Sequence, residues 1–157
     1  LDCIGVLIKG SFIDGIPSLG TSFIVDYTGG NGGPQAGQVV NSTGVTGLIA
    51  TLSPDNFNVG VGSLTYIVTG TPVGVGVASF SLVIGGQACT VEIEVSTGII
   101  ASLDCANAVV TNNLFINLTA IGVTATVSYL GGNGGSHPGQ VVASTGVLGL
   151  TAEVCID

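Results

Sequence analysis

Residues 77–95 read VASFSLVIGGQACTVEIEV, two apolar runs on either side of a glycine pair. Val77–Ile84 and Cys89–Val95 each have the length of a strand, and Gly85-Gly86 is a favoured two-residue turn between antiparallel strands. The second run alternates valine and isoleucine with glutamate, which is typical of a half-buried strand. This stretch therefore predicts a β-hairpin.

Outward from the hairpin, five more short runs are rich in Val, Ile, Thr and Leu and are bounded by turn residues. Val, Ile and Thr favour strands, and no run has the 3.6-residue period of a helix. We expect turns at Pro54-Asp55-Asn56 and at Gly70-Thr71-Pro72. The predicted fold is all-β, with strands at Cys3–Lys9, Thr21–Tyr27, Gln38–Ser42, Leu48–Leu52, Ser63–Thr69, Val77–Ile84 and Cys89–Val95.

The chain also repeats itself at an offset of 102 residues, without a gap over residues 1–55. Leu1-Asp2-Cys3 recurs as Leu103-Asp104-Cys105, and the GQVV of residues 37–40 recurs at 139–142. A period of 102 is close to the size of an immunoglobulin-like sandwich and too long for a solenoid repeat. We therefore predict tandem immunoglobulin-like β-sandwiches.

On this interpretation residues 1–102 form one complete repeat, and residues 103–157 form the first half of a second, homologous one. Half a sandwich would expose a strand edge and half a core. Either the protein continues beyond residue 157, which we expect, or another chain supplies the missing strands.

The four cysteines fit this interpretation only in part. Cys3 lies on the first predicted strand and Cys89 on the last, and the terminal strands of a Greek-key sandwich can be neighbours, so we predict a Cys3–Cys89 disulfide. Cys105 repeats Cys3, whereas Cys155 stands where the first repeat has Ser53. Cys155 either pairs with Cys105 or stays free. The lack of a Cys-x-x-Cys motif argues against a zinc site.

The composition excludes several classes of partner. The chain has 157 residues and is 46% hydrophobic but only 6% charged, with one lysine, no arginine and a net charge of −8. Binding a nucleic-acid backbone or an anionic membrane surface needs a basic patch, which one lysine cannot supply. No apolar run approaches the roughly 20 residues that span a bilayer. We expect an extracellular protein that neither binds nucleic acid nor inserts into a membrane.

Residues suited to catalysis are few. The single histidine, His137, stands where the first repeat has Gln35, and no serine lies in a Gly-x-Ser-x-Gly elbow. Glu92 and Glu94 share one strand face, but an exposed polar face explains them better than a pair of catalytic carboxylates. Asp55, Asn56 and Asn58 carry oxygen atoms that could bind calcium, but a turn explains these residues better than a calcium site does. We predict no enzymatic activity, no metal and no cofactor.

The segment GGNGG occurs at the same position in both repeats, after a tyrosine. No lysine and no helix follow it, so a phosphate-binding loop is a poor explanation. A loop that binds a ligand or a neighbouring repeat is the better hypothesis. Its residues are Gly29, Gly30, Asn31, Gly32 and Gly33 in the first copy and Gly131, Gly132, Asn133, Gly134 and Gly135 in the second.

Residues 63–72 (SLTYIVTGTP), followed by Gly76 to Phe80, resemble the Gly-Thr-Pro, Gly, Phe signature of Ig-like repeats in bacterial surface proteins. The fuller pattern runs from Tyr-x-Gly-Gly-Asn-Gly-Gly through Ser-Thr-Gly-Val-x-Gly-Leu to Ile-Gly-Gly-x-x-Cys-Thr. It is similar to repeats in very large secreted proteins of Bacteroidota, including flavobacterial cell-surface adhesins. Cys155 departs from the pattern.

This resemblance implies an extracellular Ig-like array, exported to the cell surface by the type IX route and used in adhesion or gliding, with no catalytic residues. We expect the chain to be a stalk segment of a long adhesin or filament, in contact with neighbouring repeats or other copies of itself. Two alternatives are a fibre subunit completed by strand exchange and a carbohydrate-binding module that contacts surface glycans. The absence of tryptophan and the presence of only three tyrosines count against the last.

Overall fold

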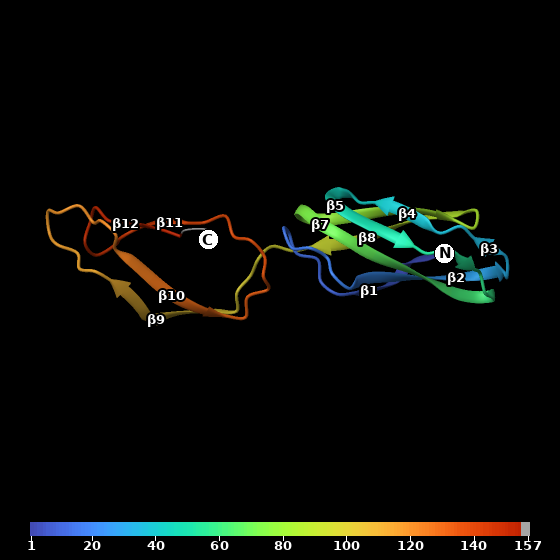
Figure 1. The fold of residues 1–157 in the computed structure, drawn as a ribbon, viewed down its shortest axis with the longest axis horizontal. Coiled ribbons are helices and arrows are strands. Elements are labelled where there is room, and N and C mark those ends of the chain that lie inside the picture. The colour runs from blue at the N-terminus through green and yellow to red at the C-terminus, as the bar shows by residue number, and fades with distance from the viewer. Residues whose placement is uncertain (155–157) are drawn as a thin grey trace. The chain divides into compact units, whose positions relative to one another are not determined.

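A computed structural model describes residues 1–154 of the chain, which divides into two compact units, Leu1–Thr97 (unit 1) and Gly98–Asp157 (unit 2). Figure 1 shows strands in both units. In the part of the chain that is described, no helix has the length and apolar character to span a bilayer. The all-β prediction is confirmed, while the division into repeats of 102 residues stays a prediction.

Unit 1 is built on one antiparallel sheet of six strands in the order β1-β2-β7-β5-β4, with β8 also paired to β7. A short ladder of β3 with β6 lies beside it. The strands are β1 (Asp2–Lys9), β2 (Thr21–Asn31), β3 (Pro34–Gln35), β4 (Gln38–Asn41), β5 (Thr43–Leu52), β6 (Asp55–Asn56), β7 (Val59–Ile84) and β8 (Gln87–Val95).

The central strand is β7, which is 26 residues long. Its first half pairs with β2, its second half pairs with β8, and β5 runs along both halves. The turn predicted at Gly70-Thr71-Pro72 is therefore wrong, because the strand continues through it. Gly70, Gly74 and Gly76 have positive φ, and the β5–β7 register shifts beside this stretch, so the glycines bend and bulge the strand instead of reversing it.

Both halves of β7 turn every second side chain into the same core. Phe23 of β2 stacks on Tyr66 from the first half of β7 and lies 5.6 Å, between ring centroids, from Phe80 of the second half. The bend in β7 thus folds the sheet so that its two parts share one interior, and β1 and β2 lie on the opposite side of unit 1 from β4 and β5 (Figure 1). This arrangement is compatible with a β-sandwich.

Other predicted boundaries differ in detail. The hairpin turn lies at Gly85-Gly86 as predicted, with φ of 58° and 76°, in the left-handed region that favours glycine. In contrast, β2 runs on to Asn31, so residues 29–31 of the first glycine-rich segment belong to a strand instead of a loop. Gly30 pairs with Gly60 and Asn31 with Val59. Residues 55–56, predicted as part of a turn, form β6 within the connection from β5 to β7.

Unit 2 consists of two separate hairpins, β9 (Ser102–Thr111) with β10 (Thr124–Leu130), and β11 (Val141–Ala143) with β12 (Thr151–Glu153). At the offset of 102 residues they coincide with β1, β2, β4 and β5. Within residues 98–154 no strand corresponds to β7 or β8, and no pairing joins the two hairpins. All the strand residues in this unit are exposed.

Candidate functional site

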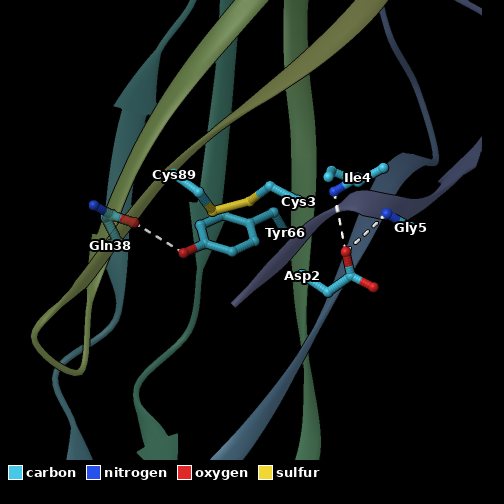
Figure 2. The surroundings of a disulfide bond; sticks show 7 residues. All are labelled: Asp2, Cys3, Ile4, Gly5, Gln38, Tyr66 and Cys89. Carbon is cyan, nitrogen blue, oxygen red and sulfur yellow. Dashed lines mark hydrogen bonds between the residues drawn. A yellow bond between two sulfur atoms is a disulfide. The ribbon is translucent and has the colours of Figure 1, made fainter.

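A disulfide joins Cys3 of β1 to Cys89 of β8, the first and last strands of unit 1 (Figure 2). The two Cα atoms are 6.2 Å apart, within the usual range for a disulfide. The predicted pairing is confirmed. Because the bond encloses a sequence separation of 86 residues, it constrains nearly the whole unit, and it is typical of proteins outside the reducing cytosol.

Close to the disulfide, the side chain of Gln38 connects β4 to both halves of β7. Its Oε1 accepts a hydrogen bond of 2.8 Å from the Tyr66 hydroxyl (Figure 2), and its Nε2 donates one of 3.1 Å to the Val83 carbonyl. Burial raises the pKa of Tyr66 to about 12, so this phenol stays neutral and remains a donor at ordinary pH. The amide therefore fixes the edge hairpin to the central strand.

At the start of β1, the Asp2 carboxylate accepts hydrogen bonds from the backbone N–H groups of Gly5 (3.0 Å) and Ile4 (3.1 Å) (Figure 2). These two bonds hold the pKa of Asp2 below its ordinary value, and the bond from Gly5 has the larger effect. They stabilise the irregular stretch of β1, where the pairing with β2 shifts between Asp2 and Leu7.

The first glycine-rich segment packs around Tyr27. This side chain is 8% exposed, its hydroxyl accepts a hydrogen bond of 2.7 Å from the Asn58 N–H, and its ring meets Phe57 edge-on. A Cβ atom on Gly62, directly opposite Tyr27 on β7, would overlap the Tyr27 hydroxyl, and one on Gly30 would meet the ring and the Asn58 carbonyl. Close packing against one tyrosine therefore explains two of the glycines.

The second copy of the segment keeps only the local part of this geometry. Asn133 Oδ1 accepts a hydrogen bond from Gly135 N–H, as Asn31 Oδ1 does from Gly33 N–H, at 3.2 and 2.9 Å. Tyr129, the counterpart of Tyr27, is 61% exposed. The role of both segments as binding or inter-repeat loops stays a prediction.

The remaining residues singled out from the sequence lie apart. Glu92 and Glu94 occupy the exposed face of β8. His137 Nδ1 accepts a hydrogen bond from Gly139 N–H, the same bond that Gln35 Oε1 accepts from Gly37 N–H, so the histidine replaces a backbone-binding glutamine. Among the described residues, no three His, Cys, Asp or Glu side chains form a group that could hold a metal ion.

The most unusual surface belongs to unit 2. Here β10 and β12 each pair on one side only, with β9 and β11, whereas their counterparts β2 and β5 pair on both sides. Cys105, the counterpart of Cys3, is exposed with a free thiol. Its predicted alternative partner, Cys155, lies outside the described residues. We call the unpaired edges of β10 and β12 the open edges of unit 2. The repeat pattern predicts an exposed strand edge in the half repeat but does not indicate which strands carry it.

Comparison of the chain with models of known protein families, with curated proteins and with solved structures found no match.

Proposed function

We propose that this chain is a structural segment of a long extracellular protein, the stalk of a cell-surface adhesin or filament, and that it has no catalytic role. The observation that carries the proposal is the Cys3–Cys89 disulfide, which ties the first strand of unit 1 to its last. In a molecule that transmits tension, a covalent bond between the first and last strands of a unit keeps the unit from being pulled open.

Tension applied beyond the two ends of unit 1 reaches Cys3 through residues 1–2 and Cys89 through residues 90–97, so the disulfide carries the force and the residues between the cysteines are not extended. Without the bond, the 86-residue separation would extend by roughly 300 Å, at about 3.4 Å per residue. The oxidised unit therefore behaves as a spacer of fixed length.

The repetition of strands supports a serial arrangement. The four strands of unit 2 lie 102 residues after β1, β2, β4 and β5 in the sequence. This spacing is expected when one type of module is used more than once. We propose that each complete module is an immunoglobulin-like sandwich and that its neighbours are further modules of the same protein. The few charges on the chain and the disulfide favour a place outside the cell.

The adhesin assignment rests on the resemblance of residues 63–80 to Ig-like repeats of bacterial surface proteins. Export by the type IX route and a part in adhesion or gliding are extensions of that resemblance. A glycan-binding role has less support: Tyr129 is exposed, but its counterpart Tyr27 is buried and uses its hydroxyl within the fold.

Single-molecule stretching of the chain from its two ends tests the proposed mechanical role. We expect no long extension step from unit 1 in the oxidised protein and a step of roughly 300 Å after reduction. The Cys3→Ser/Cys89→Ser variant should give that step without reductant, and Cys105→Ser serves as the matched control that should not. A long unfolding step in the oxidised protein would rule out the fixed-length spacer.

Electron microscopy of the native protein isolated from its source tests the serial arrangement. The proposal predicts extended arrays of similar modules. Compact single particles would contradict it.

A further inference from the structure

We propose that Asn133 of unit 2 is a site of self-modification, where the side-chain amide is lost through a cyclic imide formed with Gly134. This inference goes beyond the stalk proposal and does not depend on it. The dipeptide Asn-Gly occurs twice in the chain, at residues 31–32 and 133–134, in the centre of the two glycine-rich segments. Both copies have the sequence GGNGG, so any difference in their reactivity comes from the folded structure around them.

The reaction needs only the chain itself and water. The backbone nitrogen of Gly134 attacks Cγ of Asn133, a new C–N bond forms, and the bond from Cγ to Nδ2 breaks. The proton of the attacking nitrogen leaves with Nδ2 as ammonia. Water then opens the imide at one of its two carbonyl carbons, which leaves aspartate or isoaspartate at position 133. Glycine suits the attacking position, because it has no Cβ to hinder the approach of its nitrogen.

In both copies a hydrogen bond holds the carboxamide in position for this attack. Asn133 Oδ1 accepts a bond of 3.2 Å from Gly135 N–H. Asn31 Oδ1 accepts one of 2.9 Å from Gly33 N–H. The ring that each bond closes contains every atom of the future imide ring, so the side chain stays on the side of the intervening glycine nitrogen. That glycine is exposed in both units, with φ of 80° in unit 2 and 79° in unit 1.

Asn133 differs from Asn31 in a second hydrogen bond to Oδ1. The Ile99 N–H donates to this oxygen at 2.9 Å, and the Ile99 carbonyl accepts a bond of 3.1 Å from the Asn133 N–H. Gly98, the first residue of unit 2, packs so closely that a Cβ on it would overlap the backbone of residues 135–136. The start of unit 2 is therefore seated against the second glycine-rich segment.

The second donor stabilises the transition state of the attack. As the nitrogen approaches Cγ, Oδ1 gains negative charge, and hydrogen bonds to this oxygen become stronger than they are before the reaction. Gly135 and Ile99 thus act on Asn133 as the two donors of an oxyanion hole act on a carbonyl oxygen. Among the residues that the structure describes, Asn31 Oδ1 has a single donor.

The backbone around the two asparagines also differs. Closing the imide ring requires rotation about the Cα–C bond of the asparagine. Asn31 belongs to β2 and pairs with Val59 of β7, so the sheet resists this rotation. Asn133 lies after the end of β10 and outside the described strands. Both differences favour the reaction at Asn133 over the reaction at Asn31.

The modification would release the start of unit 2. In isoaspartate the main chain runs through the former side chain and gains one carbon, so the paired bonds between Ile99 and Asn133 lose their geometry. Each event also adds a negative charge to a chain that already carries −8. Hydrogen exchange of the Ile99 amide should be about tenfold faster in the modified chain. Unchanged exchange would contradict the release.

Peptide mapping of the full chain, kept folded in warm buffer at mildly alkaline pH, tests the proposal by mass spectrometry. We expect Asn133 to lose its amide at least about fivefold faster than Asn31, with isoaspartate among the products and isotope-labelled oxygen taken up from the water. In denaturant with reductant the two rates should converge, because the local sequences are the same. Equal rates in the folded chain would overturn the proposal.

Two variants separate the causes. Ile99→Pro removes the second donor and should slow the reaction at Asn133 to about the rate at Asn31. The rate at Asn31 reports in the same sample whether unit 1 is intact. An unchanged or faster reaction at Asn133 would mean that Ile99 does not assist it and would overturn the proposal. Asn133→Gln keeps an amide but needs a larger ring, so the mass gain at this position should disappear; its persistence would mean direct hydrolysis by water and would also overturn the proposal.

Discussion

Units 1 and 2 contain the same four strands at a fixed spacing but differ in almost every measure of burial. In unit 1, β2 and β5 contribute to a closed core, and Val25, Leu48 and Ala50 are fully or almost fully buried. In unit 2 the corresponding strands form two separate hairpins with all their residues exposed. Isolated two-stranded hairpins are marginal in water, and a third strand with a shared apolar face is what stabilises them.

The comparison assigns a specific role to β7. It is the one strand that touches both hairpins and β8, and its two halves supply Tyr66 and Phe80 to the same core. In unit 1, buried side chains of β7 and β8 complete the core that β2 and β5 begin.

The largest expected effect comes from breaking the disulfide. Reduction, or the Cys3→Ser/Cys89→Ser variant, should destabilise unit 1 by about 4–5 kcal/mol in the chain-entropy model, since the closed loop is long. Cys105→Ser is the matched change in unit 2 and should alter the stability of unit 1 by less than about 0.5 kcal/mol. Calorimetric unfolding measures both variants, and similar effects would contradict the contrast between the units.

A matched pair of leucines tests the core directly. Leu48→Ala removes a side chain that is 1% exposed and should cost about 2–5 kcal/mol, because it leaves a cavity between β5 and its neighbours. Leu150→Ala makes the same change at the counterpart in unit 2, where no closed core exists, and should change stability by less than about 0.5 kcal/mol. Denaturant unfolding followed by circular dichroism compares the two, and a large loss from Leu150→Ala would break the comparison.

The pH dependence of stability tests the role of Tyr66 in unit 1. Its folded pKa of about 12 lies above the ordinary value of 10.0, so the stability that it contributes is complete below pH 10 and is lost as the pH rises from 10 towards 12. Tyr66→Phe should cost about 1 kcal/mol at neutral pH through the lost bond to Gln38 and should reduce the alkaline loss. Tyr129→Phe, on β10, is the control and should keep the wild-type alkaline profile. An unchanged profile for Tyr66→Phe would contradict this assignment.

The smallest effect concerns Asp2. Its pKa is lowered in the folded state by the Gly5 and Ile4 N–H groups, so its contribution is present above its ordinary pKa and is lost as the pH falls through the folded value. Asp2→Asn should therefore make unit 1 slightly less sensitive to acid. Acid titration of the melting temperature checks this, with Asp104→Asn in unit 2 as the matched variant. A steeper acid dependence for Asp2→Asn would be the contradicting result.

Sequence patterns predicted the strands best where alternation and turn chemistry agree. Residues 77–95 form the predicted hairpin, and the Cys3–Cys89 pairing followed from the positions of the two cysteines on the first and last strands. The same rules failed at Gly70-Thr71-Pro72. A glycine with positive φ can reverse a chain or bulge a continuing strand, and only the pairing of β5 along both halves of β7 decides between the two.

The site was less predictable, for a related reason. The glycine-rich segments were predicted to be loops, yet Gly30 and Asn31 pair with β7 and Gly30 packs on Tyr27. A close approach of side chain and backbone leaves no periodic signal in the sequence. No sequence pattern predicted the burial of Phe12 either, because this residue lies in the connection between β1 and β2 and not in a strand. The open edges of unit 2 could be anticipated only in outline, because their geometry depends on which strand lies between the two hairpins of a complete unit.

The central claim is that β2 is held in a closed core while its counterpart β10 is not. Native-state hydrogen exchange of the 157-residue chain, resolved by residue, tests this claim most directly. The account predicts that amides of β2 exchange at least about a thousandfold more slowly than those of β10, as expected for a folded domain beside an open hairpin. Equal protection of the two strands would contradict it.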